Sequence, residues 1–134
     1  MSDWNTQVIA EFRANGGKVA QFGDAPLVIL HTIGAKSGGV REIPLVALTE
    51  GDSMVVFASA AGSPKHPDWY FNLLATSEID VEFGSEKFRA SVVEVPAPDA
   101  AAKLATMATR MPQFGDYVGK AAPRVIPAFA ITRL

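Results

Sequence analysis

The residues best suited to chemistry lie in a glycine-rich loop at residues 34–41. Three glycines, Ser37 and the cations Lys36 and Arg41 stand there between two apolar runs. Glycines let a backbone approach a ligand and point N–H groups at it, and arginine offers a planar fork for phosphate. The spacing is that of neither a P-loop nor a dinucleotide-binding loop. The loop predicts an anion site, although a solvent-exposed hairpin loop could have the same composition.

A second candidate segment, residues 58–72, follows an apolar run and continues into three successive aromatic residues. Ser59 and backbone donors near Gly62 could hold the edge of a ligand, and Asn72 could offer its amide to a ring carbonyl. Trp69 could form the wall of a pocket. The same residues are also typical of a core aromatic cluster that follows Ser-Pro and His-Pro turns.

The third candidate segment contains Phe114 and Tyr117, with Met107 and Met111 close by in the sequence. Aromatic rings and thioethers make an adaptable apolar surface. Such a surface could line a substrate pocket or could pack over the end of a sheet. Arg124, further along, could cap the preceding helix or join the anion site.

Several other kinds of site are not expected. His31 and His66 are the only histidines, and His31 in its apolar strand is expected to be a satisfied core residue. Two histidines without clustered carboxylates do not predict a metal site. The chain has no cysteine and no Gly-x-Ser-x-Gly motif, so neither a thiolate nor a serine nucleophile is expected.

The composition predicts one globular domain over residues 1–134. Hydrophobic residues make up 49% and charged residues 19%, with a net charge of -2. This balance gives no general attraction to nucleic acid. The polar N-terminus does not resemble a secretory signal, and no apolar run approaches the roughly 20 residues that span a bilayer. A cytoplasmic protein without an integral membrane segment is expected.

The hydrophobic pattern predicts an α+β fold with a mainly antiparallel sheet of about six strands and flanking helices. The order is helix, three strands, helix, two strands, helix and strand, which favours a small barrel. The second and third strands are expected to form a hairpin, and Glu82 is expected to face solvent. The expected helices are 4–15, 67–75 and 99–110, with a proline-broken aromatic segment at 111–120, and the expected strands are 27–33, 42–49, 54–60, 78–83, 87–95 and 126–134.

The order of these segments along the whole chain resembles the deazaflavin-dependent nitroreductase family of actinobacteria. The matching motifs are Glu11-Phe-Arg-Ala-Asn-Gly-Gly-Lys18, Gly34-Ala-Lys-Ser-Gly, Arg41, Pro44-Leu45, Ala58-Ser59, Gly62, His66-Pro67, Trp69, Asn72-Leu73, Tyr117 and Arg124-Val-Ile-Pro127. The resemblance implies a split β-barrel, the fold shared with flavin-mononucleotide-binding oxidoreductases. It also implies an 8-hydroxy-5-deazaflavin coenzyme (coenzyme F-420), which carries a phosphodiester and a polyglutamate tail.

The resemblance also implies roles for individual residues. Ala35, Lys36 and Ser37 would hold the coenzyme phosphate beside Arg41, and the strand Glu42, Ile43, Pro44, Leu45 and Val46 would run along the ring. Phe57, Ala58, Ser59 and Ala60 would contact the other edge of the ring or the linker, with Ala60 standing where relatives often have lysine. Asp68, Trp69, Tyr70, Phe71 and Asn72 would close the site. Tyr117 would act on the substrate, with Phe114 beside it.

The implied activity is hydride transfer to a small electron-poor acceptor such as an enone, a quinone or a nitro compound. Two other functions stay open at this point. The same barrel could carry the deazaflavin without turnover, or it could be an oxidoreductase that uses flavin mononucleotide. The sequence leaves open whether the protein is a monomer or a homodimer.

Overall fold

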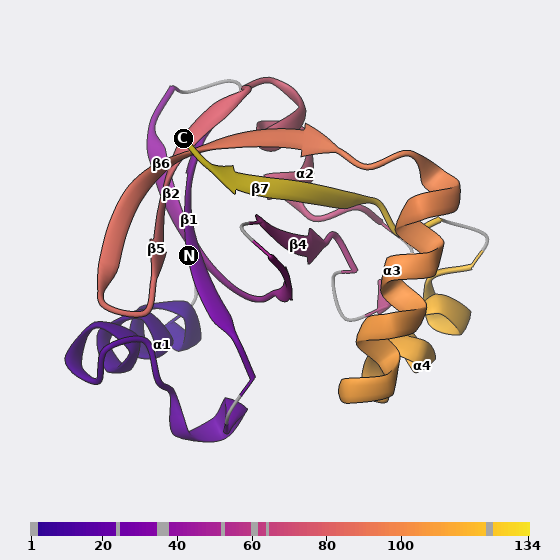
Figure 1. Cartoon of the computed structure of the whole chain (residues 1–134), viewed down its shortest axis with the longest axis horizontal. Helices are drawn as coiled ribbons and strands as arrows, with labels where there is room; N and C mark the ends of the chain where they lie inside the picture. The colour runs from indigo at the N-terminus through magenta and orange to yellow at the C-terminus, as the bar shows by residue number, and fades with distance from the viewer. Residues whose placement is uncertain are drawn as a thin grey trace.

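A curled antiparallel sheet forms a half-barrel, and helices cover its outer faces and one end (Figure 1). The computed structural model describes residues 3–23, 25–34, 38–51, 53–59, 62–63, 65–122 and 125–134. Within these residues the sheet has seven strands in the order β2-β1-β5-β6-β7-β4-β3. This confirms the predicted α+β split-barrel class, with one strand more than expected.

The elements follow one another in nearly the predicted order. They are α1 (Asp3–Ala14), a 3-10 turn (Ala20–Phe22), β1 (Leu27–Ile33), β2 (Val40–Val46), β3 (Leu48–Glu50), β4 (Ser53–Phe57), α2 (Asp68–Leu74), β5 (Glu78–Phe83), β6 (Glu86–Glu94), α3 (Ala97–Arg110), α4 (Gln113–Ala121) and β7 (Ala128–Arg133). In the described residues, no helix is long and apolar enough to cross a bilayer.

The prediction of one strand over 42–49 is wrong, because this stretch forms two strands that pair with different partners. β2 pairs with β1, whereas β3 pairs with β4. The chain changes partner at Ala47, whose N–H donates to the carbonyl of Pro26 at 2.9 Å. Only β3 therefore forms the expected hairpin with β4. Pro44 lies in β2 at the edge of the sheet, as its missing N–H requires.

The proline-broken segment predicted at 111–120 contains a helix. Pro112 stands at the N-cap of α4, so the proline begins this helix instead of interrupting it. The buried side chain of Phe114 packs with Met107 of α3 in one hydrophobic cluster. This packing fixes a helix that contains two glycines and therefore has low intrinsic propensity.

The apolar side chains form three clusters that fix the layers of the fold. One fills the half-barrel and includes Val28, Leu30 and Trp69. A second joins the outer face of β4 to α3 and α4. The third packs α1 on the opposite face of β1, where Leu27 and Ile29 point. β1 is buried on both faces, which explains its nearly continuous apolar sequence.

Candidate active site

A cleft of about 350 Å³ opens where β2, the end of β4, α2 and α4 meet. It lies between segments that are far apart in the sequence, and most of its lining is aromatic or aliphatic. The described lining residues are Asn5, Phe22, Ile43, Pro44, Leu45, Val46, Phe57, Ser59, Trp69, Phe114 and Tyr117. Both the volume and the composition are typical of a small-molecule pocket.

Nine of the predicted site residues line this cleft, and they come from the strand after the glycine-rich loop, from the end of β4 with the segment that follows it, and from α4. No described residue of the loop at 34–41 lines it. The nine residues are Ile43, Pro44, Leu45, Val46, Phe57, Ser59, Trp69, Phe114 and Tyr117. The structure therefore brings the predicted ring-binding strand, the small residues after β4, the aromatic helix and the predicted substrate tyrosine to one place.

The other predicted residues lie elsewhere. Ala58 and Asn72 are buried, whereas Asp68 and Phe71 are exposed. Tyr70 faces a separate hollow, where its ring stacks on His66 at 4.3 Å between centroids. Arg41 and Glu42 line a neighbouring outer groove, and Ala35, Lys36, Ser37, Ala60 and Arg124 lie outside the described residues.

Aromatic side chains from three elements build the walls of the cleft. The ring of Phe114 meets those of Phe57 and Tyr117 edge to face, at centroid distances of 6.1 and 5.3 Å. Trp69 is 9% exposed and packs on Phe129 inside the half-barrel. Trp69 is thus a core residue and a pocket wall at once, because α2 closes one end of the barrel. The rings are held by the core and are already in place for a planar ligand.

Gly62 fixes the position of Tyr117 relative to the loop after β4. Its φ is 84°, and its N–H donates to the carbonyl of Ser59 at 2.9 Å. A Cβ at Gly62 would lie 2.7 Å from the Cβ of Lys120 and 3.3 Å from the Cα of Tyr117. The loop and α4 approach so closely that glycine is required here on both conformational and steric grounds.

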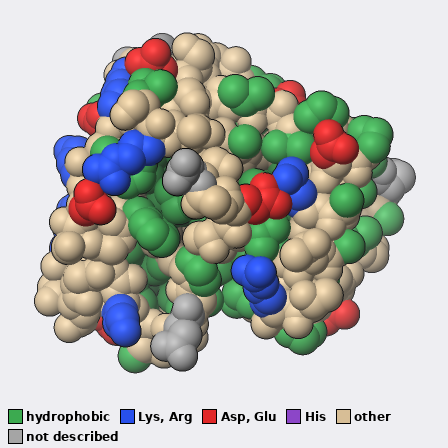
Figure 2. Space-filling model, in the orientation of Figure 1, with side chains coloured by type: hydrophobic (Ala, Val, Ile, Leu, Met, Phe, Trp, Pro, Cys, Tyr) green, Lys and Arg blue, Asp and Glu red, His purple; other side chains and the backbone are tan. Residues whose placement is uncertain are grey.

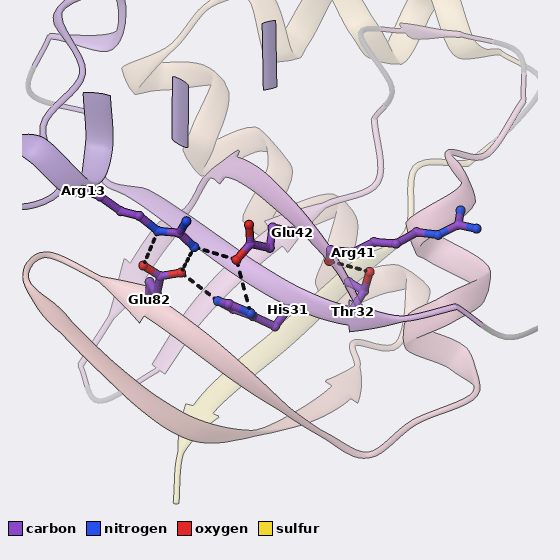
Figure 3. Close-up of polar contacts among 6 residues, drawn as sticks. All are labelled: Arg13, His31, Thr32, Arg41, Glu42 and Glu82. Atoms are coloured by element: carbon purple, nitrogen blue, oxygen red, sulfur yellow. Dashed lines mark hydrogen bonds and ion pairs between the residues drawn. The ribbon is translucent and has the colours of Figure 1, made fainter. Parts of the chain in front are cut away.

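Arg41 and Glu42 are neighbours in β2 whose side chains point to opposite faces of the sheet (Figure 3). Arg41 is exposed, and no carboxylate in the described part of the chain forms an ion pair with it. Its backbone carbonyl accepts a hydrogen bond from the hydroxyl of Thr32 at 3.1 Å. The guanidinium extends away from the acidic residues and is available to bind an anion.

Glu42 instead belongs to an ionic cluster beneath α1 (Figure 3). Arg13 donates from Nε and Nη2 to the two oxygens of Glu82, at 3.0 and 2.7 Å, and from Nη2 to Glu42 at 2.5 Å. His31 donates from Nε2 to Glu82 at 2.7 Å. The hydrogen bond from Arg13 is the main reason that the pKa of Glu82 falls to about 2.

The expectation that Glu82 faces solvent is wrong, because α1 covers this face of β1 and β5. His31 is a satisfied buried residue, as the sequence predicted. His31, Glu42 and Glu82 have ligand atoms within 4.8 Å of one another, which is a spacing that could suit a metal ion. The guanidinium of Arg13 already contacts both carboxylates and supplies the positive charge there.

Two residues of the cleft, Asn5 and Phe22, were not predicted. Asn5 lies in the first turns of α1 and Phe22 in the 3-10 turn that follows it. Neither stands in a motif, and both reach the cleft only because α1 packs beside β2. No local signal in the sequence could have identified them.

Solved structures with the same fold were found. An F420-H2 dependent reductase (FDR-A) is 32% identical, with a TM-score of 0.70 over 79% of this chain and 93% of that chain. A structure described as a domain-swapped dimer is 31% identical, with a TM-score of 0.72 over 96% of this chain and 97% of that chain. The heme storage protein HutZ from Vibrio cholerae, at 14% identity and a TM-score of 0.60, shares the fold alone.

Sequence comparison agrees with the structural one. An F420H(2)-dependent quinone reductase of Mycobacterium tuberculosis (strain ATCC 25618 / H37Rv) is 32% identical over 92 residues, which are 67% of this chain. The match spans 62% of the length of that relative. The family model described as F420H(2)-dependent quinone reductase matches residues 4–132. The family expected from the sequence is therefore confirmed, and the chain belongs to the F420H(2)-dependent quinone reductase family.

Proposed function

We propose that this protein is an oxidoreductase that uses reduced 8-hydroxy-5-deazaflavin coenzyme to reduce small electron-poor acceptors, with quinones as the first class to test. The family to which the chain belongs supports the coenzyme and the quinone. The Mycobacterium tuberculosis relative and the solved structure FDR-A are named F420-dependent reductases. The two solved structures at 31–32% identity share the fold over 79% and 96% of this chain.

The observation that carries the proposal is that an aromatic cleft lies next to a groove that contains Arg41. The groove, of about 490 Å³, is lined by residues of α1 and by Val40, Arg41 and Glu42. Asn5 lines both the groove and the cleft, so the two hollows are neighbours. A ligand with a planar ring and an anionic tail requires this combination of an apolar slot and an adjacent free cation.

The charged and aromatic side chains in and near the cleft suit the deazaflavin coenzyme. Arg41 offers an exposed guanidinium for the phosphate, and the rings of Phe57, Trp69 and Phe114 offer flat walls for the tricycle. The loop that precedes Arg41 is closed by hydrogen bonds from the N–H of Gly34 to the carbonyl of Gly39 and from the N–H of Gly38 to that of Gly34, each at 2.8 Å. These bonds hold the base of the loop next to β2.

When bound, the coenzyme supplies hydride, and the protein supplies position and electrostatics. In the proposed complex, β2 and the aromatic walls orient the ring, and the buried side chains around the cleft exclude water from one of its faces. Tyr117 lines the cleft and is half-buried, and its phenol would donate a hydrogen bond or a proton to an acceptor oxygen. Phe114 beside it has no hydroxyl, so Tyr117 would donate alone on this side of α4.

The oligomeric state is a separate part of the proposal. One structural neighbour is described as a domain-swapped dimer. It supports a homodimer for this chain over a monomer. Light scattering of the purified protein at several concentrations distinguishes the two states, because a dimer doubles the measured mass.

Binding of the coenzyme is tested by titrating the protein with oxidised deazaflavin coenzyme and, in parallel, with flavin mononucleotide, with fluorescence as the readout. We expect saturable binding of the deazaflavin and much weaker binding of the flavin nucleotide. Binding of flavin mononucleotide alone would refute the proposal and support the flavin-dependent alternative.

A further inference from the structure

The described lining of the cleft contains no charged residue, although the proposed reaction creates negative charge there. Its side chains are aromatic or aliphatic apart from Asn5, Ser59 and the phenol of Tyr117. On the face shown in Figure 2, hydrophobic side chains likewise form the hollow between the half-barrel and the helices, and charged side chains stand around it. A charge at the edge of an apolar site is screened less than one in bulk water, so a cation beside the cleft would affect the reaction.

The negative charge forms on the acceptor. An acceptor that takes up hydride gains one proton and two electrons as its new bond forms, while the bond that held the hydride breaks and the coenzyme is oxidised. A quinone or an enone thereby becomes an oxyanion, which a proton from Tyr117 neutralises before water restores the phenol. Hydrogen-bond donors and cations that face the position of this charge lower the barrier.

Lys120 lies one turn beyond Tyr117 in α4 and packs against the loop that lines the cleft. A Cβ at Gly62 would lie 2.7 Å from the Cβ of Lys120 and 3.3 Å from its Cδ, so the stem of the lysine runs along this glycine. The N–H of Gly62 donates to the carbonyl of Ser59, which is part of the cleft lining. The stem of Lys120 is therefore held beside two parts of the cleft wall, α4 and the loop after β4.

The ammonium group of Lys120 is available to a ligand. Lys120 is exposed, and within the described chain no carboxylate forms an ion pair with it, including that of Asp116 one turn earlier in α4. Arg41, in contrast, lies in β2 and lines the groove assigned to the coenzyme phosphate. The two cations come from different elements, and Lys120 is adjacent to the proposed proton donor, Tyr117.

We propose that the positive charge of Lys120 stabilises the negative charge that forms on the acceptor oxygen during hydride transfer, beside the hydrogen bond from Tyr117. The inference rests on the proposed function and adds a second residue of α4 to the reaction. A lysine in the last turn of a helix also interacts favourably with the helix dipole, but that interaction affects stability alone. The test therefore needs readouts that stability does not change.

The first readout is the rate of hydride transfer in a single turnover, with protein that is saturated with reduced coenzyme and mixed rapidly with menadione. Lys120→Met keeps the stem that packs on Gly62 and removes the charge, so we expect about tenfold slower transfer, the scale of one charge at the edge of a desolvated site. Lys120→Arg restores the charge and should stay close to wild type. Lys87→Met, at an exposed lysine of β6, is the matched control and should leave the rate unchanged. Thermal melting shows that each variant is folded.

The second readout needs no turnover. The probe is 2-fluoro-4-nitrophenol, an acidic phenol whose anion resembles a reduced quinone and whose fluorine NMR shift reports its ionisation. When the probe binds to protein that holds oxidised coenzyme, its pKa should be lower by about 1 than in water, which is a tenfold preference for the anion. Lys120→Met should remove most of this preference, and Lys120→Arg should keep it.

The outcomes separate this inference from the proposed function. If wild-type protein does not accelerate the oxidation of reduced coenzyme by menadione, the proposed function fails, whereas a preference for the phenol anion that depends on Lys120 would still show the anion site. If Lys120→Met matches wild type in both readouts, or if Lys120→Arg is as impaired as Lys120→Met, the role of Lys120 is overturned and the reductase remains. Weaker coenzyme binding in Lys120→Met with an unchanged rate at saturating coenzyme would also overturn it, because the charge would then act on the coenzyme tail.

Discussion

Arg13 of α1 binds both carboxylate oxygens of Glu82 in β5, 69 residues further along the chain. The pair joins the first helix to the middle of the sheet, and Glu42 and His31 complete the cluster. Bidentate contacts between arginine and a carboxylate are among the stronger ionic interactions. Because α1 also supplies Asn5 to the cleft, this cluster helps to hold one wall of the proposed coenzyme site.

Replacing Glu82 should destabilise the fold. Glu82→Gln keeps the shape of the side chain but leaves Arg13 and His31 without their shared carboxylate, and we expect the free energy of unfolding to fall by about 2 kcal/mol. Urea denaturation measures the change. Glu86→Gln is the control, because Glu86 pairs with Arg133 at an exposed site where ion pairs contribute little. An equal loss in both variants would contradict a special role for the cluster.

The same residue should make stability depend on acid pH. The folded-state pKa of Glu82 is about 2, below its ordinary value of 4.5, so the unfolded chain takes up the proton first as the pH falls. The contribution of the pair is therefore complete above pH 4.5 and decreases as the pH falls towards 2. Urea denaturation over this range should show the difference between wild type and Glu82→Gln shrinking with falling pH. A constant difference would contradict the assigned pKa.

Arg41 should contribute to coenzyme binding without contributing to stability. We expect Arg41→Ala to weaken binding of the oxidised deazaflavin coenzyme about tenfold or more, the scale of a lost charge-assisted hydrogen bond. The melting temperature should stay unchanged, since the guanidinium has no ion-pair partner in the described residues. Lys87→Ala removes an exposed cation of β6 as a control. Unaltered affinity in Arg41→Ala would exclude the phosphate role of Arg41.

Gly62 and Gly51 provide a matched pair for the packing of α4. Both have positive φ, 84° and 58°, but a Cβ would meet Lys120 at Gly62 and nothing within 4 Å at Gly51. Alanine at either position is strained by the positive φ. The free energy of unfolding of Gly62→Ala should fall by about 1–3 kcal/mol more than that of Gly51→Ala, because α4 must also shift. Calorimetry measures the difference. Gly62→Ala should also lower kcat/KM, because Tyr117 moves with the helix. Equal stability of the two variants would mean that the close approach is unimportant.

Tyr117 is expected to assist reduction of the acceptor. Tyr117→Phe keeps the ring that packs on Phe114 and removes the hydroxyl, so we expect kcat to fall by roughly a hundredfold with little change in coenzyme affinity. Tyr70→Phe is the comparison, because Tyr70 is the other tyrosine of the chain and faces a different hollow. If Tyr70→Phe weakens coenzyme binding more than Tyr117→Phe does, Tyr70 would contact the coenzyme, as the family resemblance implies.

Much of the fold could be predicted because strands such as β1 and β5 have clear apolar patterns between turn residues. The division of 42–49 could not, since the apolar run continues through Ala47 and the change of partner depends on the curl of the sheet. α4 could not be predicted as a helix, because Pro112 and two glycines lower the helix propensity of this segment. In each case tertiary packing decided what local propensity left open.

The candidate site was predictable in part. Ser59 and Trp69 were singled out by the composition of the segment 58–72 as well as by the family resemblance, and the fold places both at the cleft. Asn5 and Phe22 could not be found, because only the docking of α1 beside β2 brings them to the cleft. The partial burial of Glu82 was missed for a related reason: strand alternation predicts an outward side chain but cannot show that a helix covers the outer face.

The proposed reductase activity is tested most directly by the oxidation of reduced deazaflavin coenzyme by menadione, with the protein present and absent. The readout is the return of the visible absorbance of the oxidised coenzyme. We expect a rate that exceeds the protein-free rate, is proportional to protein concentration and saturates with menadione. Tight coenzyme binding with no rate above the protein-free reaction, for menadione and for cyclohexenone and nitroimidazole acceptors alike, would contradict it and identify the protein as a coenzyme carrier.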